Sequence, residues 1–166
     1  MARLAGSEEL SQRIAALRRF REMLLAQRDR FREYLAVLDK EPEVIARGDT
    51  GALLSYVELE EHIVRDIFNI QRVIDPLEGL CHDLAAFGGG TKDARTGEEA
   101  ELGSLKAAVE RLKEEAVANA ARNRGLLSGR MAEIRAEIKG LRGNPHAARQ
   151  SIYADGGRPL MIDVEG

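Results

Sequence analysis

Apolar residues recur at intervals of seven along the first part of the chain, and this spacing most constrains the fold. The repeat consists of Leu10, Leu17, Leu24, Phe31 and Leu38. A sustained seven-residue repeat is typical of helices that pack along an extended, left-handed seam. About half of the residues are Ala, Leu, Glu, Lys or Arg, which is also typical of long helices. The sequence therefore predicts an all-α fold.

Three helices are expected, covering about residues 7–41, 49–87 and 97–141. Ser7 is the expected N-cap of the first helix, and the segment Thr96–Glu99 matches a capping box that would open the last one. Pro42 should end or bend the first helix, because proline lacks an N–H group and clashes with the preceding turn. Pro76 predicts either a kink in the second helix or a restart.

The turns between the helices are predicted from their residues. The stretch 47–50, Arg-Gly-Asp-Thr, indicates a turn with a new N-cap, and Gly88 to Gly90 should stop the second helix. The residues from there to Arg95 are expected to form a flexible linker.

Charge is distributed unevenly between the three segments. The middle segment, 49–101, is acidic, whereas 1–38 and 102–149 are both basic. Antiparallel packing of the middle helix against the other two would use this pattern. We therefore expect residues 1–143 to form an elongated, three-helix, coiled-coil-like bundle. Residues 144–166 are expected to form a short, non-helical tail, because apolar residues alternate there around the turn signal Asp155-Gly156-Gly157.

The overall charge disfavours a protein dedicated to nucleic acid. The chain has 25 basic and 28 acidic side chains, a net charge of −3 and a pI of about 5.7. No apolar run approaches the roughly 18 residues that a membrane span needs, and the first residues do not match a signal peptide. The expectation is a cytoplasmic protein without membrane insertion. An adaptor that binds DNA or anionic membranes through Arg18, Arg19 and Arg21 is retained as a rival.

No residue pattern supports catalysis or a cofactor. Cys81, His82 and Asp83 are adjacent, but neighbouring helical side chains point about 100° apart and cannot converge on one ion. His62 lies among acidic residues at helical spacing, and the pair Glu60-Glu61 is expected to be surface charge. We therefore predict a protein that is not an enzyme and that holds neither a metal nor a cofactor.

The order of features resembles the FlgN family of flagellar export chaperones for hook-associated proteins. A long amphipathic helix leads into ARGDTGALLSYVELEEHIVRDI, a glycine break follows, and a last long helix contains NRGLLSGRMAEIRAEI. Gly48-Asp49 with Leu53 resembles the turn that follows the first helix in that family. Asn123-Arg124 with Leu126-Leu127 resembles its last helix, and Tyr153 near Gly156-Gly157 resembles its tail.

The resemblance implies binding without catalysis. Such a chaperone binds the C-terminal segment of hook-associated proteins and delivers them to the cytoplasmic domain of the export gate. An amphipathic helix that docks in this way needs an apolar stripe that is not used internally. The expected substrate-binding residues are Leu126, Leu127, Met131, Ile134, Ile138 and Leu141. Ile152 and Tyr153 are expected to dock on the export gate.

Two alternatives remain open at this point. The stripe of the last helix could close the three-helix seam, with the tail folded back on it. The chain could instead be a structural coiled-coil scaffold that associates with itself and has no secretion substrate. Apolar residues at seam positions can pack within a monomer or between the two copies of a homodimer, so the sequence does not decide between these states.

Overall fold

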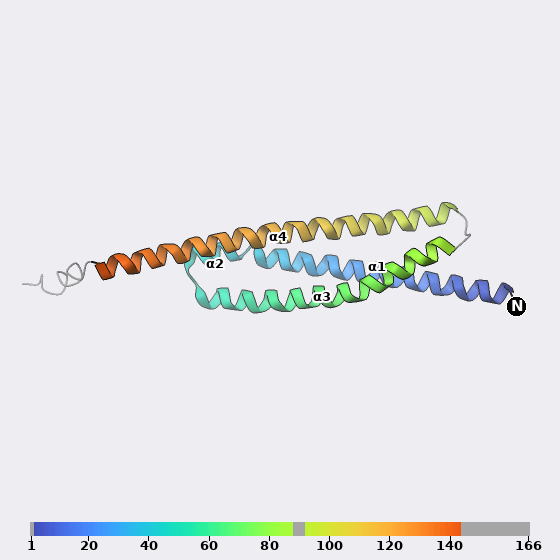
Figure 1. Cartoon of the computed structure of the whole chain (residues 1–166), viewed down its shortest axis with the longest axis horizontal. Coiled ribbons are helices and arrows are strands. Elements are labelled where there is room, and N and C mark those ends of the chain that lie inside the picture. The colour runs from blue at the N-terminus through green and yellow to red at the C-terminus, as the bar shows by residue number, and fades with distance from the viewer. Residues whose placement is uncertain (1, 88–91, 144–166) are drawn as a thin grey trace, which may run out of the picture. The chain divides into compact units, whose positions relative to one another are not determined.

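The structure, a computed structural model, describes residues 2–87 and 92–143, which are helical apart from short turns (Figure 1). Helix α1 spans Ala2–Leu38, α2 spans Glu41–Arg47, α3 spans Thr50–Phe87 and α4 spans Lys92–Gly143. No strand is present within these two ranges. The predicted all-α fold is therefore confirmed for the described residues, and the predicted tail, 144–166, lies outside them.

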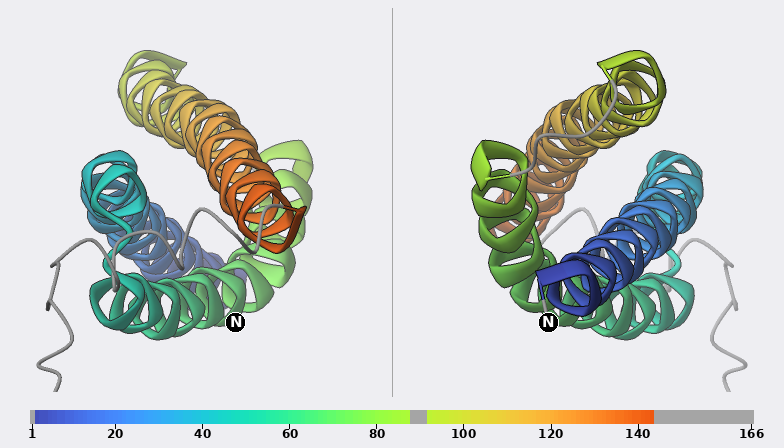
Figure 2. Two further views of the ribbon diagram at one scale, coloured as in Figure 1. Left: turned by 90° about the vertical axis from the view of Figure 1, so that its left-hand side faces the viewer. Right: turned by 90° about the vertical axis from the view of Figure 1, so that its right-hand side faces the viewer.

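The chain forms two compact units, Met1–Leu126 and Leu127–Gly166, and α4 contributes to both. Within the first unit, α1, α3 and the part of α4 before residue 127 pack against each other. Figure 2 shows these helices surrounding a common interior. The described part of the second unit is the remainder of α4, residues 127–143.

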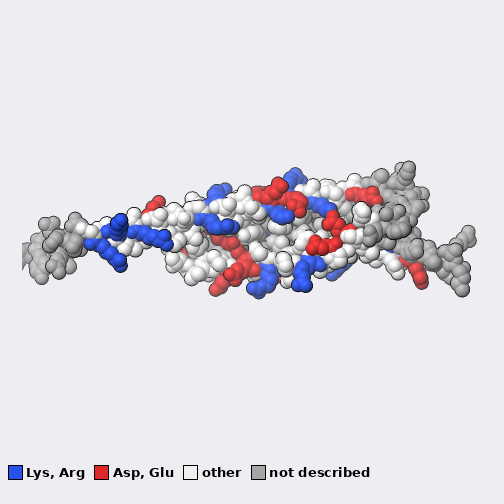
Figure 3. All heavy atoms as spheres, viewed as in Figure 1, with Lys and Arg blue, Asp and Glu red and all other residues white. Residues whose placement is uncertain are grey.

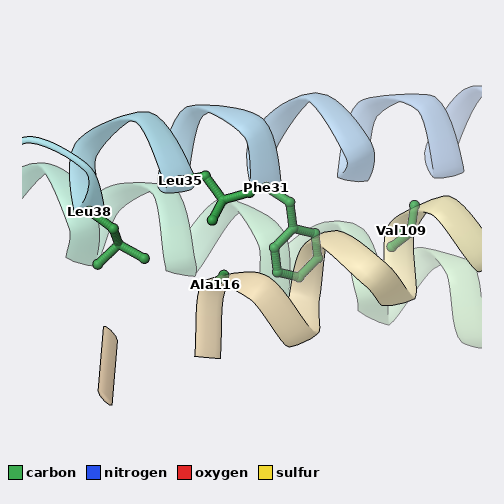
Figure 4. Close-up of a cluster of buried hydrophobic side chains, with 5 residues drawn as sticks. All are labelled: Phe31, Leu35, Leu38, Val109 and Ala116. Atoms are coloured by element: carbon green, nitrogen blue, oxygen red, sulfur yellow. The ribbon is translucent and has the colours of Figure 1, made fainter. Parts of the chain in front are cut away.

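Two hydrophobic clusters hold the first unit together. One joins the end of α1 to the middle of α4, and its buried members are Phe31, Leu35, Leu38, Val109 and Ala116 (Figure 4). The other is nearer the start of α1, and its buried members are Phe20, Leu24, Ile74 and Leu102. Because α3 contributes Ile67 to the first cluster and Ile70 to the second, all three long helices share both. The predicted seven-residue repeat is confirmed as core at Leu24, Phe31 and Leu38.

The chain turns sharply between α1 and α3, as Pro42 and the predicted turn suggested. Helix α1 ends at Leu38, and Pro42 lies in the first turn of the short helix α2, where its missing N–H costs little. Gly48 ends α2 with a φ of +68°, a backbone conformation that residues with a side chain rarely adopt. The Asp49 side chain then accepts a hydrogen bond from the N–H of Ala52 at 3.0 Å, which caps α3.

The N-caps predicted for the first and the last long helix are both wrong. Ser7 lies inside α1, which begins at Ala2, and Thr96 lies inside α4, which begins at Lys92. Residues 92–95 are therefore helical rather than part of a linker. The residues upstream of each expected cap are mostly strong helix formers, such as Ala, Arg, Leu and Lys, so the helix continues through the capping signal.

Helix α3 continues through Pro76 without restarting. Figure 1 shows that the last part of α3 is turned relative to its beginning. A proline inside a helix removes one backbone hydrogen bond and produces such a bend. The kink that the sequence suggested is the alternative that agrees with the structure.

Ion pairs connect the acidic α3 and the start of α4 to their basic neighbours. Arg30 contacts Asp66 at 3.5 Å, and Arg21 contacts Glu101 at 2.8 Å, while Lys106 pairs with Glu78. Each exposed pair contributes only about 0–1 kcal/mol to the free energy of unfolding. Their main effect is to favour one arrangement of neighbouring helices over others. None of the described helices is long and apolar enough to cross a membrane.

Candidate protein-binding surface

The last part of α4 carries an exposed apolar stripe. All residues from Met131 to Gly143 are exposed. The exposed fractions of the large apolar side chains are 46% for Met131, 41% for Ile134, 45% for Ile138 and 75% for Leu141. Their spacing of three, four and three residues places them on one side of a helix. We call these four residues the α4 stripe.

The other predicted binding residues differ in their placement. Leu127 is half-buried and is spaced so that it extends the α4 stripe by one turn. Leu126 is exposed but is offset from that spacing by one position, so it does not belong to the same side of the helix. Ile152 and Tyr153 lie outside the described residues. The structure thus brings together five of the six residues predicted to bind substrate.

The α4 stripe continues the side of α4 that is buried in the first unit. Leu102, Val109, Ala116 and Asn123 are buried at intervals of seven. Leu127, Ile134 and Leu141 follow at the same interval, beginning four residues after Asn123, and residues four apart lie on the same side of a helix. This side of α4 is therefore buried as far as Asn123 and exposed from Met131 onward.

Basic side chains outnumber acidic ones around the α4 stripe. Four basic residues lie among positions 127–143, namely Arg130, Arg135, Lys139 and Arg142, against Glu133 and Glu137. Arg130 pairs with Glu133 at 3.0 Å. Figure 3 shows mostly blue side chains on the visible face of this part of α4. A partner helix with acidic flanks would therefore meet favourable charge here.

A buried polar junction lies where α1, α2, α3 and α4 meet in the first unit. The buried side chain of Asn123 donates hydrogen bonds to the carbonyl oxygen of Leu38 and to Oε2 of Glu41, both at 2.7 Å. Glu41 is also buried. These two bonds join α4 to the end of α1 and to the start of α2. The Asn123 amide thus fixes where the buried part of α4 ends against the other helices.

Glu60 of α3 belongs to this junction and lies against Glu41. The pKa of Glu60 is raised from 4.5 to about 8, chiefly by burial, and also by the hydrogen bond to Glu41 and by the negative charge of Glu41. A hydrogen bond from Tyr34 of α1 acts in the opposite direction. Oε1 of Glu60 is buried and receives no hydrogen bond from the described residues, so a charge there would be poorly solvated.

The prediction that Glu60 is ordinary surface charge is therefore wrong. Glu60 lies on the side of α3 that also carries Ile63 and Ile67, at helical spacing from both. That spacing could have indicated that Glu60 is partly buried. It could not have indicated which residue forms a hydrogen bond with Glu60. The partners come from α1 and α2, and their proximity depends on the turn at Pro42, whose geometry the sequence did not define.

The residues considered above for catalysis or for binding of metal or nucleic acid make packing contacts and ion pairs in the structure. Cys81 packs against the second hydrophobic cluster, and burial raises the pKa of its thiol, which favours the less reactive protonated form. His62 is exposed and lies 3.8 Å from Asp66. In the basic run of α1, Arg19 pairs with Glu22 and Arg21 with Glu101, so that the positive charge of this run is partly neutralised.

Comparison with known proteins identifies a relative of this chain. A protein of Treponema pallidum (strain Nichols), described only as uncharacterized, is 32% identical to this chain over 152 residues. The aligned region covers 91% of this chain and 89% of the Treponema protein. No known family profile matches the chain, and no solved structure matches it. The similarity extends over nearly the whole length of both proteins.

Proposed function

This chain belongs to the same family as the Treponema pallidum protein, and we propose that it is a protein-binding protein without catalytic activity. In this proposal, α1, α3 and the buried part of α4 form an antiparallel three-helix scaffold. The pairs between α1 and α3 support that arrangement, because Gln27 bonds to Gln71 while the later residue Arg30 contacts the earlier residue Asp66. The protein-binding surface in this proposal is the α4 stripe.

The exposure of the α4 stripe is the observation that carries the proposal. Four large apolar side chains on one side of a helix remain exposed, whereas the same side of this helix buries Leu102, Val109 and Ala116. An amphipathic segment of another protein would bury this stripe by docking its own apolar face against it. Met131 adds adaptability, because its unbranched side chain fits surfaces of different shape.

The specific activity we propose is that of a FlgN-type flagellar export chaperone. Its substrate would be the C-terminal segment of a hook-associated protein, which it would bind in the cytoplasm and deliver to the cytoplasmic domain of the export gate. Ile152 and Tyr153 would make the contact with the gate. The proposal is supported by the resemblance of the turn at Gly48-Asp49 and of the last helix to that family, together with the exposed stripe.

Binding to a hook-associated segment tests the proposal directly. The full-length chain and a chain stopped at Gly143 would each be mixed with the C-terminal segment of a hook-associated protein from the same cell. Size-exclusion chromatography with light scattering would report co-elution and mass. We expect both chains to form a defined complex, because the α4 stripe ends before residue 144. A complex with the full-length chain alone would place the binding site in residues 144–166 instead.

Substitutions in the α4 stripe distinguish specific binding from non-specific hydrophobic association. The double variant Ile134→Ser and Ile138→Ser should lose the complex while the protein stays folded, since both side chains are exposed. Val117→Ser is the matched control, because Val117 is also an exposed apolar residue of α4 but lies outside the stripe. Loss of binding in the control, or retention in the double variant, would contradict the proposed site. If no variant binds and the chain forms a stable homo-oligomer through the stripe, the scaffold function replaces the chaperone function.

A further inference from the structure

Helix α3 also carries an exposed apolar surface, on the side next to its buried face. The buried face carries Ile63 and Ile74. The neighbouring side carries four exposed large apolar residues, which we call the α3 outer face: Leu54, Val57, Val64 and Phe68. Two of them, Leu54 at 65% and Phe68 at 63%, are among the most exposed large apolar side chains of the described residues.

The spacing of the α3 outer face matches a helix–helix seam. Leu54, Val57, Glu61, Val64 and Phe68 follow one another at intervals of three, four, three and four residues. This is the spacing at which two helices interdigitate their side chains along a common line. Four of these five positions are apolar and exposed, and an exposed apolar surface on a folded protein indicates a site of association.

The charges beside the outer face are self-complementary. Glu58 and Glu61 lie in its first half, and Arg65 and Arg72 lie in its second half. None of the four forms an ion pair with any residue in the described ranges 2–87 and 92–143. By contrast, Arg19, Arg21 and Arg30 on α1 are all paired. The α3 outer face thus combines an apolar seam with unpaired acidic and basic ends.

We propose that the α3 outer face is the interface of a symmetric homodimer, in which two copies of α3 pack antiparallel. A two-fold axis brings the acidic half of each copy against the basic half of the other. In the register that aligns the seam positions, Val57 of one copy lies opposite Phe68 of the other, and Glu58 lies near Arg65. Such an isologous interface uses the same patch on both copies and closes on itself.

A second copy fits the charges of this surface better than an unrelated partner does. A uniformly acidic or basic partner helix would meet repulsion along half of the outer face. An antiparallel copy meets attraction along both halves, because its charge order is reversed. The surface also leaves the α4 stripe out of the interface, so the dimer would not use the residues proposed to bind the substrate.

Sedimentation equilibrium of the full-length chain, over a range of micromolar concentrations, measures the dimer. Wild type should dimerise reversibly, and Phe68→Ser should shift the equilibrium to monomer without loss of helical circular dichroism. The matched control is Ile14→Ser, which changes an exposed apolar residue of α1 and should leave the dimer unchanged. A monomeric wild type, or a dimer that survives Phe68→Ser, would overturn the proposal.

Charge reversal tests the antiparallel pairing itself. Glu58→Arg and Arg65→Glu should each weaken the dimer by about tenfold, because each creates two repulsive contacts across the two-fold axis. An equimolar mixture of the two single variants should dimerise again, since every such contact then joins opposite charges. Failure of the mixture to recover would overturn the two-fold arrangement. If Phe68→Ser instead removes binding of the hook-associated segment to a monomeric chain, the outer face binds a different protein and the dimer proposal is wrong.

Discussion

At the scale of single residues, Glu60 makes the stability of the protein depend on pH. Its pKa is about 8 in the folded protein, against an ordinary value of 4.5. Between these values the folded state binds more protons than the unfolded chain, so the free energy of unfolding falls as pH rises. The contribution is fully present below 4.5 and is lost as the pH passes 8. Because Glu60 is only half-buried, solvent screening makes the fall smaller than the whole pKa shift implies.

We therefore expect Glu60→Gln to flatten this dependence. The neutral amide keeps a donor for Glu41 at every pH, so that the variant should be more stable than wild type above pH 8 and similar to it near pH 5. Thermal unfolding followed by circular dichroism across this pH range measures the effect. Glu114→Gln, which changes an exposed acidic residue of α4, should keep the slope of wild type. An unchanged slope in Glu60→Gln would show that another group titrates.

Asn123 contributes to stability through its two buried hydrogen bonds. Asn123→Ala removes the hydrogen bonds that Asn123 donates to the Leu38 carbonyl and to the Glu41 carboxyl group in a buried place. Such a loss costs about 1–3 kcal/mol in the free energy of unfolding, which urea denaturation would measure. Asn119→Ala is the comparison, because Asn119 donates one bond of 3.2 Å to exposed Asp39. A cost there equal to that at Asn123 would contradict the importance of burial.

These residues show why sequence reasoning predicted the exposed apolar stripe but not the buried junction. The α4 stripe is a periodic pattern of apolar residues within one helix, and periodicity can be read directly from the sequence. The junction joins Tyr34, Glu41, Glu60 and Asn123, which come from four different helices. Each of them is unremarkable in its local sequence. Only the three-dimensional arrangement shows that their polar groups converge.

At the scale of helices, the sequence predicted the existence of the long helices better than their ends. The seven-residue repeat identified the core positions of α1, because packing against neighbours selects apolar side chains at that interval. The capping signals at Ser7 and Thr96 failed, because a capping residue favours a helix end but does not prevent helix formers upstream from continuing. The seven-residue helix α2 is too short for any periodic signal.

The glycines of α4 make a prediction at this scale. Gly129 lies inside α4, and a Cβ atom added there would meet no atom within 4 Å. Gly129→Ala should therefore stabilise the helix around it by about 1 kcal/mol. Hydrogen exchange of the amides between residues 130 and 141 should slow by roughly fivefold, since local opening becomes less frequent. Gly103→Ala, which also has free space but lies in the first unit, should leave those amides unchanged. Equal slowing in both variants would mean that this segment opens only with the whole protein.

At the scale of the whole molecule, stability and proposed binding belong to different parts of the chain. Every member of the two hydrophobic clusters lies within Met1–Leu126, and so do Asn123 and the residues that it joins. The α4 stripe lies entirely within Leu127–Gly166. A protein arranged in this way can vary its binding surface without altering its core.

This division predicts the behaviour of a chain stopped after Leu126. Its midpoint of thermal unfolding should stay close to that of the full-length chain, because both clusters and the polar junction are retained. Its complex with a hook-associated segment should be lost, because the α4 stripe is removed. Differential scanning calorimetry and size-exclusion chromatography measure the two properties on the same samples. The chain stopped at Gly143 is the control, since it should keep both. A large drop in the midpoint with the shorter chain alone would show that residues 127–143 stabilise the core, and the separation of core from binding surface would then be wrong.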